Sequence, residues 1–237
     1  MKIILGFIFF LVNIVSVKAQ YDFENYPKIK FKDYQWDFTE LEDKFVHKID
    51  VPNFYNNSKP LSVEIKYFAG ISRNSEINIS GTIYQEDIPF TPIGLDSLRI
   101  ADVNGDGLND IKIISYYMGN GFASLNVRVI YFFQEENGKF IKIAYNDKMG
   151  TNRFERDFDG DGNFEIITMK IQNHKNHNYW LFNIYDFIEG KLKNVNSKAN
   201  YPIMIQILDN ETFKITNKLS RQEMKKYEVI QPEDDNY

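Results

Sequence analysis

The chain contains 237 residues, carries a formal net charge of −5 and has no cysteine, and its length fits one large all-β domain or two small ones. The acidic balance argues against nucleic acid as a partner, because phosphate binding needs a basic surface, and the lack of cysteine excludes disulfide bonds. Twenty Phe and fifteen Tyr make the composition rich in residues that favour strands.

The chain begins with a pattern typical of a secretory signal peptide. Lys2 precedes an almost entirely apolar run over residues 3–17, which is shorter than the ~20 apolar residues of a membrane-spanning helix. Val17 and Ala19 supply the small residues that a cleavage site needs. We therefore expect residues 1–19 to be removed, no membrane span to remain, and the protein to be secreted or periplasmic.

Strand signals follow in the first third of the remaining chain. Residues 61–68 and 77–84 each alternate apolar and polar side chains, as half-buried strands do. Residues 70–75 between them are rich in Gly, Ser and Asn, which predicts a hairpin turn. Residues 39–42 carry a Thr and a Glu in the spacing of a capping box, which predicts one short helical turn.

An acidic loop then places oxygen-bearing side chains at every second position. Asp102, Asn104 and Asp106 hold positions 1, 3 and 5, Asp110 holds position 9, and Gly107 stands at position 6, where a ligand loop turns sharply. Three carboxylates at one centre are unfavourable without a cation. Hard oxygen ligands of this density suit Ca²⁺ better than Zn²⁺ or Cu²⁺.

The same pattern returns later in the chain. Asp157, Asp159, Asp161 and Glu165 occupy positions 1, 3, 5 and 9 of a second loop, with Gly162 at position 6. Because Glu is one methylene longer than Asp, we expect the second loop to bind a cation more weakly or less selectively than the first.

Each loop opens a repeat that continues through about three more strands. The repeats cover about residues 98–150 and 151–195, and Tyr131 matches Tyr185 when they are aligned. A period of roughly 50–60 residues with about four strands is typical of a propeller blade or a similar repeated sheet. The long strand of each repeat is apolar on both faces, so we expect it to be covered on both sides.

These loop-and-strand units resemble the FG-GAP or VCBS repeat, the calcium-loop blade of the integrin α-subunit propeller and of many secreted bacterial proteins. The resemblance implies that side chains at positions 1, 3, 5 and 9 and the carbonyl at position 7 bind Ca²⁺. The implied ligands are Asp102, Asn104, Asp106, Leu108 and Asp110 in the first loop, and Asp157, Asp159, Asp161, Asn163 and Glu165 in the second.

The fold expected from these patterns is all-β, with repeated antiparallel sheets in a propeller-like arrangement or a partial propeller. A smaller β-domain built on the two calcium-loop repeats is the alternative. We expect a single domain over residues 20–230, a short helix capped by Ser220 and Glu223, and a frayed acidic tail at 231–237.

The sequence contains no Gly-x-Ser-x-Gly motif and no cysteine nucleophile, so we expect no catalysis. His47 is predicted to lie on the surface, and His174 and His177 in a solvated hairpin turn rather than in a transition-metal site. The favoured function is a secreted, calcium-binding adhesion module that recognises an extracellular protein or polysaccharide. An inhibitor or immunity protein of a lysozyme-type cell-wall hydrolase, and an uncharacterised secreted hydrolase, are the alternatives.

N-terminal sequencing of exported protein tests the signal peptide. We predict that the mature chain begins at Gln20, with a blocked terminus where Gln20 has cyclised. A mature protein that still begins at Met1 would show an uncleaved anchor and contradict this prediction.

Overall fold

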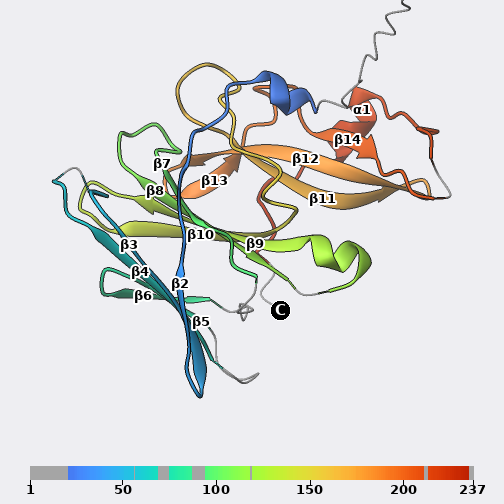
Figure 1. Cartoon of the computed structure of the whole chain (residues 1–237). Helices are drawn as coiled ribbons and strands as arrows, with labels where there is room; N and C mark the ends of the chain where they lie inside the picture. The colour runs from blue at the N-terminus through green and yellow to red at the C-terminus, as the bar shows by residue number, and fades with distance from the viewer. Residues whose placement is uncertain are drawn as a thin grey trace, which may run out of the picture.

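The computed structural model describes residues 21–55, 57–68, 75–86, 94–117, 119–210 and 213–234. These residues form three antiparallel sheets, and over the described ranges none of the sheets closes on itself (Figure 1). The all-β prediction is therefore confirmed. The predicted signal peptide at 1–19 lies outside the described residues.

The N-terminal sheet consists of five strands in chain order. Its strands are β2 (Asp37–Glu40), β3 (Lys44–Val51), β4 (Leu61–Phe68), β5 (Ser75–Ile79) and β6 (Thr82–Glu86). Side chains on β4 alternate between buried and half-buried positions, which confirms the period that the sequence showed there.

Two sequence predictions fail in this sheet. The expected single strand at 77–84 is a hairpin, because Ser80 and Gly81 turn the chain with φ angles of +47° and +97°. The side chain of Asn78 accepts the backbone N–H of Gly81 at 2.9 Å and holds that turn. The expected helical turn at 39–42 is also wrong, since its first two residues belong to β2 and pair with β3.

The central sheet contains the first repeat. Its strands, in sheet order, are β1 (Lys32–Tyr34), β7 (Leu98–Ala101), β8 (Asp110–Tyr116), β9 (Asn126–Gln134) and β10 (Phe140–Lys148), with the 3-10 turn η2 (Gly121–Leu125) before β9. On β9, Ile130 and Phe132 pack into the core shared with the N-terminal sheet. Val129 and Tyr131 point the other way, into the core shared with the C-terminal sheet. The sheet is therefore covered on both faces, as its apolar strands predicted.

The C-terminal sheet contains the second repeat. β12 (His177–Ile188) lies at its centre, with β11 (Ile166–His174) on one edge and both β13 (Lys191–Asn194) and β14 (Ile203–Gln206) on the other. The β11–β12 turn has positive φ at Lys175 and Asn176, which confirms the predicted hairpin.

The helices are short. Besides η2, they are the 3-10 turn η1 (Asp22–Asn25), α1 (Arg221–Met224) and the 3-10 turn η3 (Lys225–Tyr227). Ser220 and Glu223 form a reciprocal capping box at the start of α1, as predicted. In the part of the chain that the structure covers, no helix has the length and apolar character needed to cross a membrane.

The segment before the N-terminal sheet ties all three sheets together. Phe23 packs on the outer face of the C-terminal sheet, and Ile29 lies in the core between the central and C-terminal sheets. The chain then adds β1 to the central sheet and β2 to the N-terminal sheet, as the blue trace in Figure 1 shows. Because short pieces of this segment join different sheets in turn, it has no readable hydrophobic period.

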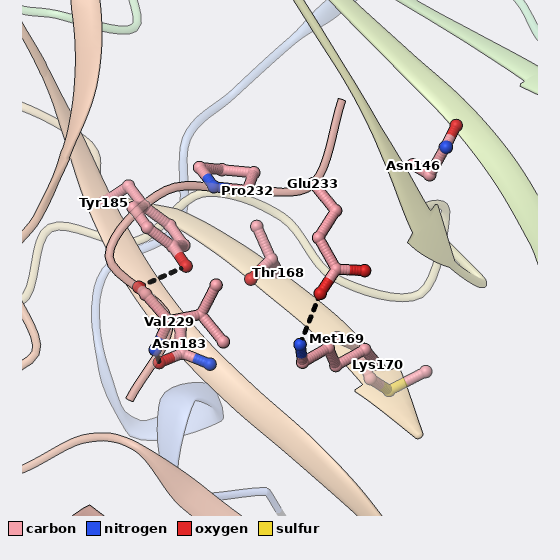
Figure 2. Close-up of a pocket in the computed structure, with 9 residues that line it drawn as sticks. All are labelled: Asn146, Thr168, Met169, Lys170, Asn183, Tyr185, Val229, Pro232 and Glu233. Carbon is pink, nitrogen blue, oxygen red and sulfur yellow. Dashed lines mark hydrogen bonds and ion pairs between the residues drawn. The ribbon is translucent and has the colours of Figure 1, made fainter. Parts of the chain in front are cut away.

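Residues 233 and 234 of the predicted frayed tail are docked on the sheets, and residues 235–237 lie outside the described part of the chain. Figure 2 shows Tyr185 donating a hydrogen bond to the Val229 carbonyl and Lys170 paired with Glu233, at 2.8 and 2.6 Å. The cavity beneath the C-terminal segment measures about 30 Å³, which is room for one or two water molecules. The segment therefore covers this small cavity beside β11 and β12.

Two buried ion pairs lie where the two repeats meet. Lys112 on β8 pairs with Glu155, and the hydroxyl of Tyr131 also donates to that carboxylate. Asp147 on β10 pairs with Arg153, and both side chains are 2 % exposed. Asp147 also accepts the backbone N–H of Met169 on β11 at 2.7 Å, so this one carboxylate joins the two repeats.

Substitution of Asp147 tests that junction. We predict that Asp147→Ala lowers the free energy of unfolding by about 3 kcal/mol or more, because it leaves the Arg153 guanidinium buried and unpaired. Urea denaturation measures the change, and Asp43→Ala, at an exposed position, is the control with an expected change of about 0.5 kcal/mol or less. A loss below about 1 kcal/mol for Asp147→Ala would contradict this assignment.

Candidate metal centre

A buried carboxylate closes the first loop at its neck. Asp110, the first residue of β8, has no exposed surface. Its Oδ2 accepts the backbone N–H of Val103 at 2.9 Å, and its Oδ1 accepts the backbone N–H of Gln134 on β9 at 2.9 Å. The loop is thereby fixed to both of the strands that follow it.

Asp102 and Asp106 also accept hydrogen bonds from within the loop. Asp102 accepts the N–H of Gly107 through Oδ2 at 2.8 Å, while its Oδ1 is buried and has no hydrogen-bond partner. Asp106 accepts the N–H of Leu108 at 2.8 Å and the side-chain amide of Asn104 at 3.0 Å. Gly107 has a φ of +82°, the conformation expected at position 6. A buried carboxylate oxygen without a partner is costly unless a cation or a proton donor binds it.

The electrostatics of the first loop also fit a cation. Burial raises the pKa of Asp110 to about 7; the two N–H bonds oppose this shift, and the charges of Asp106 and Asp102 add to it. Among the described residues, no lysine, arginine or histidine nitrogen lies within 4.0 Å of these three carboxylates. The first loop therefore offers a concentration of negative charge that suits a hard divalent ion.

The second loop has the same closure. Glu165 is fully buried, and its Oε2 accepts the N–H of Phe158 at 2.8 Å, as Asp110 does at the matching position. Asp157 accepts the N–H of Gly160 at 2.6 Å, and the Asn163 N–H donates to the Asp161 carboxylate at 2.8 Å. The two repeats thus share one loop design, although only the first has Asp at position 9.

A lysine from outside the second loop occupies its centre. The Nζ of Lys198 lies 2.7 Å from Glu165, 2.8 Å from Asp159 and 3.8 Å from Asp161. A fourth carboxylate, Asp186 on β12, lies 2.8 Å from the same nitrogen. As arranged, the second loop does not fit a metal ion, because an ammonium group already lies among its oxygens.

The acidic side chains of the second loop lie closer together than those of the first. Ligand oxygens of Asp157, Asp159 and Glu165 lie within 4.8 Å of one another, which is the closest acidic grouping among the described residues. The three carboxylates of the first loop do not reach this mutual distance. Two members of this group, Asp159 and Glu165, are paired with Lys198, so their closeness is not by itself evidence of a metal site.

The register of the strands shows which residues correspond in the two repeats. The first residue after each loop pairs with Phe132 in the central sheet and with Tyr185 in the C-terminal sheet. Tyr185 therefore corresponds to Phe132, and its sequence match with Tyr131 is wrong by one residue. By the same register Asp186 corresponds to Phe133, so the first repeat has an apolar ring where the second has a carboxylate.

Lys198 and Asp186 were missed by reasoning from the sequence. Lys198 is 33 residues from Glu165 along the chain, so no local spacing connects the two. The sequence did contain a signal for Asp186, because this residue interrupts an apolar strand. The strand was interpreted only as part of the core.

The two loops contact each other directly. The N–H of Phe164 donates to the carbonyl of Val103 at 2.9 Å. Gly105 lies against Asn163, and a Cβ at position 105 would stand 2.2 Å from the Asn163 Oδ1. A cavity of about 240 Å³ adjoins this contact and is lined by both loops and by the end of β12. An interaction that orders one loop would therefore also stabilise the other loop.

The histidines lie apart from this centre. His47 is buried on β3 against the rings of Trp36 and Tyr67, so its predicted surface position is wrong; its strand alternates, and it faces inward. His174 Nδ1 lies 2.6 Å from the hydroxyl of Tyr227 in the predicted hairpin.

Comparison with known proteins gives no match, whether to a family model, to a curated protein or to a solved structure. The resemblance of the loops to FG-GAP or VCBS repeats rests on the loop residues and remains a prediction.

Proposed function

We propose that the first loop binds Ca²⁺ and that the chain is a secreted, calcium-stabilised binding module without catalytic activity. One observation carries the calcium proposal: Asp102 holds a buried, unpartnered carboxylate oxygen beside two further carboxylates. The residues that would hold the ion are those that the family resemblance implies, listed as Asp102, Asn104, Asp106, Asp110 and the carbonyl of Leu108. The ion would supply positive charge to oxygen ligands and no redox chemistry.

Binding at this loop would stabilise the central sheet. The loop connects β7 to β8, and Asp110 extends the connection to β9 through the N–H of Gln134. A cation that neutralises Asp102 and Asp106 removes their repulsion of Asp110. The free energy of binding then adds to the free energy of unfolding, because the unfolded chain has no assembled site.

The finer architecture proposed is a partial propeller. The first repeat is a four-stranded meander of β7 to β10, with its loop between the first two strands. In the second repeat an isolated bridge between Arg156 and Glu165 flanks the loop, and β11, β12 and β13 follow. This common order supports blade-like repeats, with the N-terminal sheet as a third blade that lacks an acidic loop.

A binding role is supported by an exposed aromatic pair. Phe122 on η2 is 48 % exposed and lies edge-on to Trp180 on β12, with ring centroids 6.2 Å apart. Half-exposed aromatic side chains are suited to contact with sugar rings or with another protein. The carboxylates of the cavity between the loops, Asp161 and Asp186, are both paired with Lys198, so they do not favour the hydrolase alternative.

The calcium proposal is tested by thermal melting in chelator and in millimolar Ca²⁺. For a Kd of roughly 10⁻⁴ to 10⁻³ M, millimolar Ca²⁺ adds on the order of 1 kcal/mol to stability, which raises the melting temperature by about 2–4 °C for a chain of this size. Asp106→Asn should remove most of that increase. Asp43→Asn, which removes the same charge at an exposed position, should keep it. Equal melting temperatures of the parent chain in both buffers would contradict calcium binding.

The binding role is tested with the protein immobilised on a solid support. The measurement is the amount of purified cell-wall polysaccharide, and of envelope proteins, that the support retains. We predict retention in Ca²⁺ that falls at least about tenfold for Phe122→Ala, the loss expected where a central aromatic contact is removed. Ile83→Ala on β6, where the side chain is 56 % exposed, is the matched control and should retain as the parent does. A parent chain that retains neither class of ligand would contradict the role as a binding module.

A further inference from the structure

The turn that carries Lys198 is built into the C-terminal sheet. The backbone N–H of Lys198 donates to the Val195 carbonyl at 2.9 Å. Its neighbour Asn196 is 2 % exposed, accepts the N–H of Ile184 at 2.9 Å and donates to the Asn183 side chain at 2.9 Å. The ammonium is thus delivered to the second loop by an anchored turn and not by a free surface side chain.

The hydrogen-bonding capacity of the ammonium is fully used at this position. A lysine ammonium has three N–H donors, and three carboxylates lie at hydrogen-bonding distance, from Glu165, Asp159 and Asp186.

Two features that supply carboxylates to Lys198 occur only in the second repeat. Position 9 is Glu165, whose extra methylene leaves Oε1 free to meet Lys198 while Oε2 closes the loop. In the first repeat Asp110 uses both oxygens on backbone N–H groups. Asp186 adds a carboxylate where the register of the first repeat places Phe133.

We propose that the Lys198 ammonium replaces a metal ion in the second loop, so that the chain binds one Ca²⁺ at the first loop and none at the second. The part of this proposal that concerns the first loop rests on the proposed function, and the part that concerns the second loop does not. Ca²⁺ coordinates oxygens at about 2.3–2.6 Å, so an ion shared by Asp159 and Glu165 would take the position of the ammonium. If a Ca²⁺ ion displaced the ammonium, the positive charge of Lys198 would remain beside the dication. Two positive charges so close together are unfavourable in a partly buried site.

The experiment is calorimetric titration of the chelator-treated full chain with Ca²⁺, read as sites per chain. The parent is expected to bind one ion, and Asp106→Asn is expected to bind none. Lys198→Met and Lys198→Gln, each checked for retained β structure by circular dichroism, are expected to gain one site. Asp106→Asn combined with Lys198→Gln should then bind one ion, at the second loop.

The outcomes separate this proposal from the calcium proposal for the first loop. A parent chain with no site and a Lys198→Gln variant with one site would contradict only the proposed function and support the replacement by lysine. Two sites in the parent, or one site remaining in Asp106→Asn, would show that the second loop binds metal in the presence of Lys198 and would overturn the proposal. Folded Lys198 variants that gain no site would overturn it as well.

Discussion

The structure depends on a buried carboxylate at the ninth position of each acidic loop. Asp110 and Glu165 are fully buried, and each accepts the backbone N–H of the second residue of its loop. This bond closes the loop and starts the strand behind it. A buried carboxylate is unfavourable without a compensating charge, so a cation beside each closure would stabilise it. The first closure lies at the start of β8 in the central sheet, and the second lies directly before β11 in the C-terminal sheet.

The two repeats differ in the positive charge that lies beside this carboxylate. The second loop has the ammonium of Lys198 among its carboxylates, whereas the first has no such group within the described residues. The C-terminal sheet would then keep its order in chelator, while the central sheet would gain stability from free Ca²⁺. Such a division would suit the export that we propose, because extracellular modules bind Ca²⁺ with Kd values of roughly 10⁻⁴ to 10⁻³ M. The direct contact between the loops, through Phe164 and Val103, couples the two halves.

Features set by local spacing could be predicted from the sequence. The acidic loops, the two-faced strands and the Ser220 capping box each depend on residues a few positions apart. Features set by distant partners could not. The ammonium of Lys198 reaches Glu165 from 33 residues away. The bond from the Met169 N–H to Asp147, 22 residues apart along the chain, became visible only when β10 and β11 were placed side by side. The turn at 80–81 was missed because Ser precedes the glycine there, without the Asn-Gly or Asp-Gly pair that marks a two-residue hairpin.

A crystal grown with Ca²⁺ and measured at long wavelength shows whether the two loops hold different cations. We expect one anomalous peak per chain, about 2.3–2.6 Å from oxygens of Asp102 and Asp106, with the Lys198 side chain still among the carboxylates of the second loop. A peak within the second loop, or no peak at the first, would contradict it.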